Sequence, residues 1–257
     1  YCGSNEDAPQ ENTGKALQNE VLPQLDGTRI FLPSSSEQPE WSTIDIKTYT
    51  GGPWQMIKIP YYYHIYEKTK TYKSKNEIGL ASVQTINAVA ESNPDFNIPD
   101  SIDFPLNQSM GYHDATGDWT MGSYIKLMHN DIGRPSSIAE FLKWGDLYNN
   151  QVYRAIFEAA NKARPRNEGT ILWKTNAAWP SFNWQIFDWN LRANAGYYTM
   201  KSALKPLHVQ YSHPDAGIQV ISTLSQNRDV TVNVLVLSAD GKHSAKKEFA
   251  AHIPANQ

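Results

Sequence analysis

Two glutamates offer the chemistry that is most readily inferred from this sequence. Glu6 and Glu77 each follow an asparagine directly, and each comes where a predicted strand ends. Cleavage of a glycosidic bond with retention of configuration needs two carboxyl groups about 5–5.5 Å apart, one to protonate the leaving oxygen and one to attack the anomeric carbon. One glutamate at a strand end says little. Two of them gain weight because strand ends of one parallel barrel meet on the same face.

A dense aromatic stretch, Thr170–Tyr198, could supply the binding surface for such chemistry. It opens with a predicted buried strand, Thr170–Asn176, which contains Trp173. The loop that follows holds aromatic side chains beside polar ones: Trp179, Phe182, Trp184 and Phe187 beside Asn183, Gln185 and Asp188. Flat rings and amides can line a sugar pocket, because a pyranose offers C–H faces for stacking and hydroxyls for hydrogen bonds. The same residues could equally pack a large loop onto its own domain.

The elements that must position these residues alternate between strands and helices. Residues 1–6 are predicted to be the end of a strand, and further strands are predicted at 29–33, 44–50, 71–76 and 170–176. The predicted helices span 10–25, 79–91, 122–132, 137–164 and 197–204. Residues 92–120 are rich in Asn, Asp, Pro and Gly and predict a long irregular loop. This alternation is typical of parallel βα units.

Two of these helices carry specific signals. Ser137 and Glu140 form a predicted capping box, in which each side chain satisfies the other residue's free backbone N–H. In the helix over 10–25, Ala16, Leu17, Val21 and Leu22 form a predicted apolar face.

From Leu207 the pattern changes to β-type. Predicted strands span 207–211, 217–223 and 230–237, and Asp240-Gly241 is a hairpin-turn signal before Glu248-Phe249. These strands indicate the start of a β-sandwich, and an immunoglobulin-like sandwich needs about 7 strands.

Several motifs together resemble one enzyme family. The run WKTNAAWPSFNWQIFDW, then AGYY and KPLHVQYS, is similar to the last barrel strand and its exit in glycoside hydrolase family 2, in its exo-β-glucosaminidase and endo-β-mannosidase branch. The run GSNEDAP near the N-terminus resembles the family's catalytic loop after barrel strand four, and NEIGL resembles its catalytic segment after barrel strand seven.

This resemblance implies an α/β fold that comprises the C-terminal half of a (β/α)8 TIM barrel and an incomplete immunoglobulin-like β-sandwich. Residues 1–205 would supply barrel strands four to eight, and residues 206–257 the start of the sandwich. A complete barrel typically takes about 250 residues. We therefore expect a fragment, whose partner would be the missing N-terminal half of the same enzyme.

The resemblance also assigns roles to the two glutamates. Glu6 matches the acid/base and Glu77 the nucleophile, and Asn76 replaces the serine that usually precedes the nucleophile. Trp54 stands where the family has a tyrosine, so that an indole N–H would replace a phenol as donor to the nucleophile. Asp7 is adjacent to Glu6, and we expect its side chain to point elsewhere. For these roles Glu6 must be protonated and Glu77 ionised at the working pH.

Seven residues are expected to bind the substrate. They are polar or aromatic side chains near the predicted strand ends: Asn5, Trp54, Tyr62, Trp173, Asn176, Trp179 and Trp184. Trp173 would form the floor of the subsite for the cleaved sugar, and its alternative role is barrel core. Tyr62 belongs to a run of three tyrosines that could line the rim of the site or simply pack a loop.

Composition excludes several other classes of protein. The net charge of −3 over 257 residues leaves no basic footprint for nucleic acid. No run approaches the roughly 18 consecutive apolar residues of a membrane span. Cys2 is the single cysteine, the histidines form no metal-ligand pattern, and no phosphate loop or serine-hydrolase elbow is present. We expect no cofactor and no metal.

The leading hypothesis is a retaining β-glycosidase acting on oligosaccharides, with β-glucosaminides or β-mannosides favoured. The alternatives are a non-catalytic carbohydrate-binding or structural remnant, a β-galactosidase or β-glucuronidase of the same family, and an endo-mannanase of the same clan. The hinge KPLHVQYS speaks against the endo-mannanase, since it belongs to a multi-domain layout. The substrate type alone favours a periplasmic or secreted location.

Overall fold

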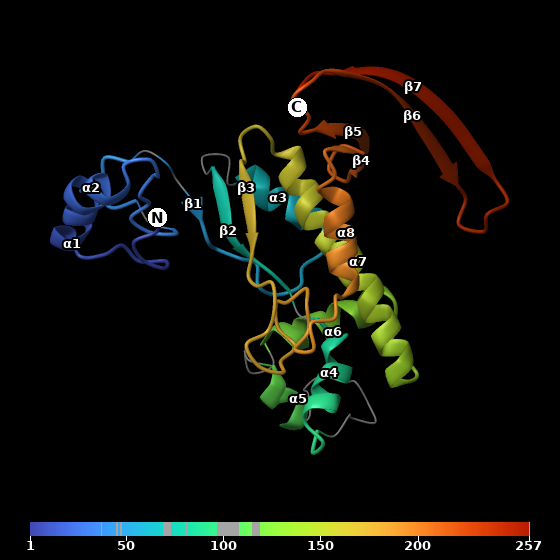
Figure 1. Ribbon diagram of the computed structural model, residues 1–257. Coiled ribbons are helices and arrows are strands. Elements are labelled where there is room, and N and C mark those ends of the chain that lie inside the picture. Colours follow the sequence, from blue (N-terminus) through green and yellow to red (C-terminus); the bar gives the residue numbers. More distant parts are fainter. Residues whose placement is uncertain are drawn as a thin grey trace.

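The computed structural model describes residues 1–36, 38–44, 46, 48–68, 73–80, 82–96, 108–114 and 119–256 of the chain. The architecture is mixed α/β (Figure 1). A parallel sheet has the order β1-β2-β3, from Thr48–Tyr49, Ser74–Ile78 and Gly169–Leu172. Cys2 and Leu32 form a further parallel bridge. Each lies in a segment predicted to be β, so the parallel βα interpretation of this region agrees with the structure.

The strands are shorter and placed slightly differently than predicted. β2 continues through Glu77 to Ile78, so the glutamate lies within the strand rather than after it. β3 ends at Leu172, before Trp173. Residues 71 and 72 of the fourth predicted strand and residues 45 and 47 of the third lie outside the described residues. Figure 1 shows β2 and β3 running toward the long loop that follows β3.

The N-terminal helical segment is confirmed, but its buried face is not the predicted one. It consists of α1 (Glu11–Ala16), the π-helical turn η1 (Leu17–Val21) and α2 (Leu22–Asp26). Its buried residues are Gly14 and Gln18, whereas Val21 is exposed. A side chain at Gly14 would overlap the ring of Trp41, so the helix packs through a glycine contact that hydrophobic periodicity does not reveal.

The central helices differ from the prediction mainly in their first residues. They are α3 (Ile59–Lys68), α4 (Thr85–Ser92), α5 (Gln108–His113) and α6 (Trp119–Asp131). The helix expected from residue 79 begins only at Thr85. α5 lies inside the segment predicted as irregular loop, of which residues 97–107 and 115–118 lie outside the described residues.

The longest helix, α7 (Ile138–Lys162), organises the hydrophobic core. It packs against both α3 and α8 (Ala195–Ala203). Its N-cap is Ser137, whose hydroxyl accepts a hydrogen bond from the backbone N–H of Glu140 at 3.2 Å. The carboxylate of Glu140 accepts from the N–H and hydroxyl of Ser136 rather than from Ser137, so only half of the predicted capping box forms.

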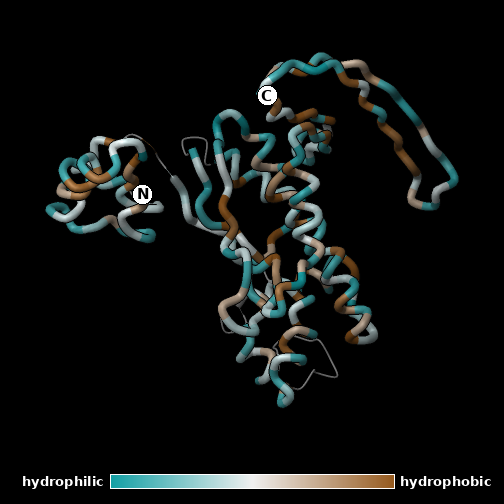
Figure 2. The backbone as a smooth tube through the Cα atoms, viewed as in Figure 1, coloured by the Kyte–Doolittle hydropathy of each residue, from teal (hydrophilic) through white to brown (hydrophobic). Residues whose placement is uncertain are grey.

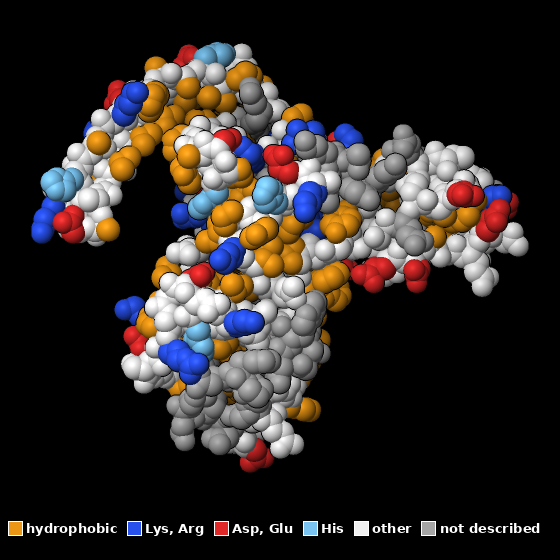
Figure 3. Space-filling model, turned by 180° about the vertical axis from the view of Figure 1, so that it is seen from behind, with side chains coloured by type: hydrophobic (Ala, Val, Ile, Leu, Met, Phe, Trp, Pro, Cys, Tyr) orange, Lys and Arg blue, Asp and Glu red, His pale blue; other side chains and the backbone are white. Residues whose placement is uncertain are grey.

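The C-terminal strands form two antiparallel pairs. β4 (Leu207–Ser212) pairs with β5 (Gly217–Ser222), and β6 (Arg228–Leu237) pairs with β7 (Ser244–Ile253). β4 is tied to α7 through Glu158, which lies 3.0 Å from His208 Nε2 and accepts on its backbone oxygen from Gln210. Hydrophobic residues run along β3 and β6 (Figure 2), and others lie exposed on the β6–β7 hairpin (Figure 3).

Candidate active site

Glu77 lies next to the end of β2, half-buried, with one carboxylate oxygen engaged. The indole Nε1 of Trp54 donates a hydrogen bond to Glu77 Oε2 at 3.2 Å. This is the donor contact that the resemblance led us to expect from the indole of Trp54. An indole N–H can donate but not accept, so this contact favours the ionised carboxylate.

The loop that carries Trp54 is fixed by two neighbouring segments. The N–H of Gly79 donates to the carbonyl of Pro53 at 3.1 Å, and the indole of Trp184 donates to the carbonyl of Trp54 at 2.6 Å. Gly79 also approaches the backbone of Trp173 so closely that an added Cβ would overlap the carbonyl oxygen of Trp173. The ends of β2 and β3 and the loop before α3 therefore meet at this glycine.

An aromatic hollow of about 670 Å³ opens at this junction. It is lined by Asn5, Trp54, Glu77, Trp173 and Trp184. Trp173 leaves 47% of its surface exposed, and Trp184 adopts a left-handed backbone conformation with φ 63°. Positive φ is costly for a bulky residue and concentrates at functional sites. The hollow joins one carboxylate to three indole faces, which is the composition expected of a sugar subsite.

Glu6 lies on an exposed loop that is held through its backbone. Its N–H donates to the hydroxyl of Ser35 at 2.8 Å, and its carbonyl accepts from the hydroxyl of Ser34 at 2.9 Å. Its φ of 63° is left-handed. Asn5, which precedes it, lines the hollow and accepts from Ser35 at 3.3 Å. Two serines that follow Leu32 therefore fix the conformation of this loop.

The electrostatic setting of Glu77 differs from the one expected for a nucleophile. Burial raises the pKa of Glu77, the Trp54 hydrogen bond lowers it, the negative charge of Glu6 raises it and the positive charge of Lys75 lowers it. The expected roles require Glu6 to be the protonated carboxyl group and Glu77 the ionised one. The structure instead places Glu77 in the drier environment, because Glu6 is exposed on its loop.

Comparison with known proteins supports the family resemblance. The chain is 23% identical over 94% of its length to a mannosylglycoprotein endo-β-mannosidase of Lilium longiflorum, and 25% identical over 76% to an exo-β-D-glucosaminidase of Amycolatopsis orientalis. Its fold matches the crystal structure of the Amycolatopsis orientalis exo-chitosanase CsxA with a TM-score of 0.77, at 23% identity over 99% of the chain. The resemblance to glycoside hydrolase family 2 is confirmed.

The match covers only part of each relative. The chain spans 28% of the lily endo-β-mannosidase, 20% of the exo-β-D-glucosaminidase and 31% of the CsxA chain. A β-D-mannosidase from Dictyoglomus thermophilum also matches in fold, with a TM-score of 0.71 at 18% identity over 99% of this chain. No protein-family model matches the chain.

Three of the residues expected to bind substrate do not line the hollow. Tyr62 is fully buried in α3 as part of the hydrophobic core. Trp179 stacks on His113 with ring centroids 5.4 Å apart, and Asn176 is exposed and bridged to Phe187. Helical periodicity explains Tyr62, since the tyrosine run lies on a helix and not on a loop. We leave these three outside the site.

The amides of the aromatic loop hold the loop itself. Asn183 is fully buried and donates to Asp114 and Thr120 at 2.8 and 2.9 Å. Asp188 accepts from the backbone and side chain of Arg192. Of the four loop aromatics, Trp184 lines the hollow and Phe182 is core. The packing interpretation therefore holds for most of this loop.

Lys75 is the residue of the site that the sequence analysis missed. It is 1% exposed and lies two residues before Glu77 on β2. The signal that could have found it is the period of a strand, which places residues i and i+2 on one face.

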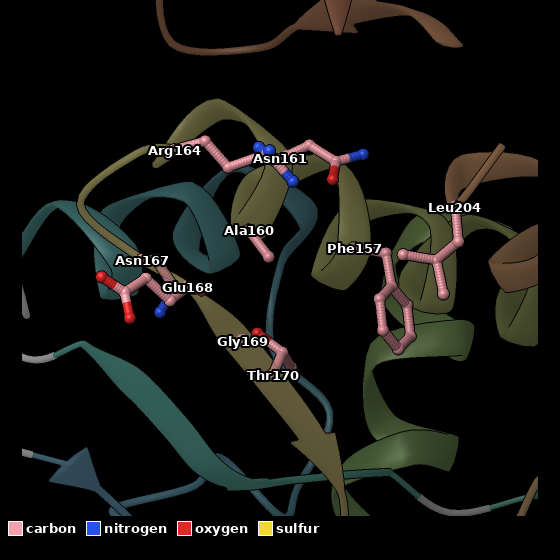
Figure 4. A pocket seen from close by; sticks show the side chains of 9 residues that line it. All are labelled: Phe157, Ala160, Asn161, Arg164, Asn167, Glu168, Gly169, Thr170 and Leu204. Atoms are coloured by element: carbon pink, nitrogen blue, oxygen red, sulfur yellow. The ribbon is translucent and has the colours of Figure 1, made fainter. Parts of the chain in front are cut away.

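A second, smaller cavity lies away from this site. It has about 160 Å³ and is lined from the C-terminal part of α7, the start of β3 and Leu204, as Figure 4 shows. It contains Arg164 and Glu168 but no pair of carboxylates. Among the described residues, no cluster of three or more His, Cys, Asp or Glu side chains could hold a metal ion. No helix within the described ranges is both long and apolar enough to cross a bilayer.

Proposed function

We propose that this chain carries the two catalytic carboxylates of a retaining β-glycosidase that acts on β-glucosaminides or β-mannosides. The observation that carries the proposal is the placement of Glu77 in a hollow of three tryptophans, with an indole N–H on its carboxylate. The negative charge of Glu6 acts on Glu77, which is expected of two carboxylates that serve one substrate. The relatives are named as exo-β-glucosaminidases and β-mannosidases, and this supports the choice of sugar.

The fold proposed with this function is half of a barrel and part of a sandwich. Cys2 and Leu32 form one parallel bridge, and β1, β2 and β3 form a parallel sheet in chain order, as strands four to eight of a (β/α)8 barrel would. We assign residues 1–205 to this partial barrel. Residues 206–257, with β4–β7, would begin an immunoglobulin-like sandwich.

The reaction would proceed by double displacement. The ionised carboxylate of Glu77 donates an electron pair to the anomeric carbon, the bond to the leaving oxygen breaks, and that oxygen takes the proton of Glu6. Water then gives a proton to the Glu6 carboxylate and attacks the anomeric carbon, which releases Glu77. Trp173 and Trp184 would stack on the sugar, and Asn5 would bond its hydroxyls.

A non-catalytic carbohydrate-binding role is the second candidate. The exposure of Glu6 favours it, because a general acid is normally shielded so that it keeps its proton near neutral pH. In that role the three indoles would bind a sugar without turnover.

The two candidates are separated by product analysis. The purified chain is incubated with p-nitrophenyl β-D-glucosaminide and p-nitrophenyl β-D-mannoside, and the first anomer of the released sugar is identified by proton NMR. A retaining glycosidase releases the β-anomer first, and the Glu77→Gln variant releases none. Initial release of the α-anomer would rule out retention. No release above that variant, together with quenching of tryptophan fluorescence by the sugar, would favour the binding role.

A further inference from the structure

Lys75 occupies an unusual position for a lysine. It is 1% exposed in the middle strand of the parallel sheet, opposite Tyr49 on β1 and Thr170 on β3. Its Nζ makes no hydrogen bond to any described residue and lies 4.2 Å from the centroid of the Tyr49 ring. Lysine is almost never fully buried unless it is paired, because removing an ammonium group from water costs several kcal/mol.

The group that offsets this cost is Glu77. Lys75 precedes Glu77 by two residues on β2, and the register of β2 against β3 shifts between Lys75 and Ile78, so the two side chains are neighbours on one strand without forming a direct ion pair. Burial lowers the pKa of Lys75 to about 7, and the charge of Glu77 opposes this change. The reciprocal effect lowers the pKa of Glu77.

The other titratable groups around this pair come from β1 and from the loop of Glu6. β1 contributes Tyr49, and β3 (Gly169–Leu172) contributes none. Glu6 is the second carboxylate that acts on Glu77 and destabilises its charge. Trp54 adds a neutral donor from the opposite side. The ionised form of Glu77 therefore has two sources of support, the indole of Trp54 and the ammonium group of Lys75, against burial and Glu6.

We propose that Lys75 is a positioning residue whose buried ammonium group is the counter-charge that keeps Glu77 ionised in the free site. The link to catalysis rests on the proposed function, in which Glu77 is the nucleophile. The electrostatic link itself is a property of the folded chain and exists whether or not the chain turns over a substrate. It also explains why a costly buried charge sits beside a pocket, since active sites commonly contain groups that a stable core would avoid.

The first test measures ionisation without any substrate. The carboxyl carbon of Glu77 is titrated by ¹³C NMR in the full chain and in the Lys75→Met and Lys73→Met variants, and the Glu77→Gln variant identifies the signal. Lys73 is the matched control, because it is exposed and pairs with Glu168 at 2.9 Å. Lys75→Met is expected to raise the pKa of Glu77, and Lys73→Met to leave it unchanged. An equal pKa in all three chains overturns the proposal.

A second measurement does not depend on the variant folding. The ε-carbon of Lys75 is titrated by NMR in the unsubstituted chain, where the structure expects a midpoint near the pKa of about 7. A midpoint near the ordinary lysine value of about 10.4 would overturn the proposal, since the side chain would then be solvated and away from Glu77.

Activity and stability distinguish a functional from a structural lysine. If the chain is a glycosidase, Lys75→Met lowers kcat/KM about tenfold at pH 5. The loss shrinks toward pH 8, where Lys75 is itself neutral. The melting temperature falls at pH 5, because removal of one partner leaves the buried charge of Glu77 uncompensated, and this loss also shrinks toward pH 8. If Lys75 had only a structural role, its replacement would lower kcat/KM and the melting temperature by similar amounts at every pH. If no variant shows activity but the pKa of Glu77 shifts, the proposed function fails and the electrostatic link stands.

Discussion

The two regions that carry Glu6 and Glu77 are built in different ways. Glu77 lies in a strand paired on both sides, with an indole on its carboxylate and a buried lysine two residues before it. Glu6 lies on an exposed loop in a left-handed conformation, held by the hydroxyls of Ser34 and Ser35. The strand fixes its glutamate through the sheet, whereas the loop relies on side chains from a neighbouring segment. Glu77 is therefore the better determined half of the site.

The two carboxyl groups also differ in their electrostatic environments. Burial destabilises the ionised state of Glu77, and the hydrogen bond from Trp54 and the charge of Lys75 stabilise it. Glu6 keeps contact with water. The chemistry assigned to each carboxylate can therefore be separated by experiments that act on one region at a time.

The largest expected effects come from replacing the carboxylates themselves. Glu77→Gln and Glu6→Gln are each expected to lower kcat/KM for p-nitrophenyl glycosides by about a thousandfold. A 2,4-dinitrophenyl leaving group needs no acid, so it should restore the glycosylation step in Glu6→Gln but not in Glu77→Gln. Wild-type activity of Glu6→Gln toward the p-nitrophenyl substrate would show that Glu6 is not the general acid.

Gly79→Ala tests the junction on the Glu77 side. The added methyl group would overlap the carbonyl oxygen of Trp173, so the ends of β2 and β3 must move apart. We expect a loss of about 1–3 kcal/mol in the free energy of unfolding, measured in urea. Gly169→Ala is the control, since nothing lies within 4 Å of its added Cβ on β3. Equal stability of the two variants would contradict the close approach.

Trp54→Phe removes the indole donor and keeps an aromatic ring in the hollow. The hydrogen bond lowers the pKa of Glu77, so its loss raises that pKa, and the ionised carboxylate then forms only at higher pH. The acidic limb of the profile of kcat/KM against pH should move upward, with about a tenfold loss at pH 5. Trp189→Phe, at an exposed position, serves as the control. An unchanged acidic limb would show that the indole does not act on Glu77.

Ser35→Ala gives the smallest effect and tests the Glu6 side. It removes the acceptor of the Glu6 N–H and the donor to Asn5. A loss of about 1 kcal/mol in total would lower kcat/KM about fivefold through misplacement of the loop, with little change in the acidic limb. Ser36→Ala is the control. A shift of the acidic limb would contradict the account, because it would mean that the loop of Glu6 governs the ionisation of Glu77.

The sequence predicts the strongly periodic elements well. The alternation of Val230, Val232 and Val234 in β6 and the apolar spacing of α7 follow directly from the periods of a strand and a helix. Glu77 and Trp54 were predicted as partners through the family resemblance, and a hydrogen bond joins them.

The remainder depends on contacts that no local pattern encodes. Tyr62 looked like a rim residue because three tyrosines suggested a loop, but a helix turns it into the core. Trp179 stacks on His113, which lies more than sixty residues earlier in the chain. Lys75 was missed because charged residues are expected on surfaces, and only the strand period together with burial reveals it.

The central claim is that Glu77 is the nucleophile, and covalent trapping tests it most directly. The chain is incubated with 2,4-dinitrophenyl 2-deoxy-2-fluoro-β-D-mannoside, whose fluorine slows release of the glycosyl intermediate, and the labelled peptide is sequenced by mass spectrometry. The account predicts one 2-fluoromannosyl group, bound to the carboxylate of Glu77 and absent from Glu77→Gln. A label on Glu6 or Asp7, or an unlabelled chain that still hydrolyses the p-nitrophenyl glycosides, would contradict it.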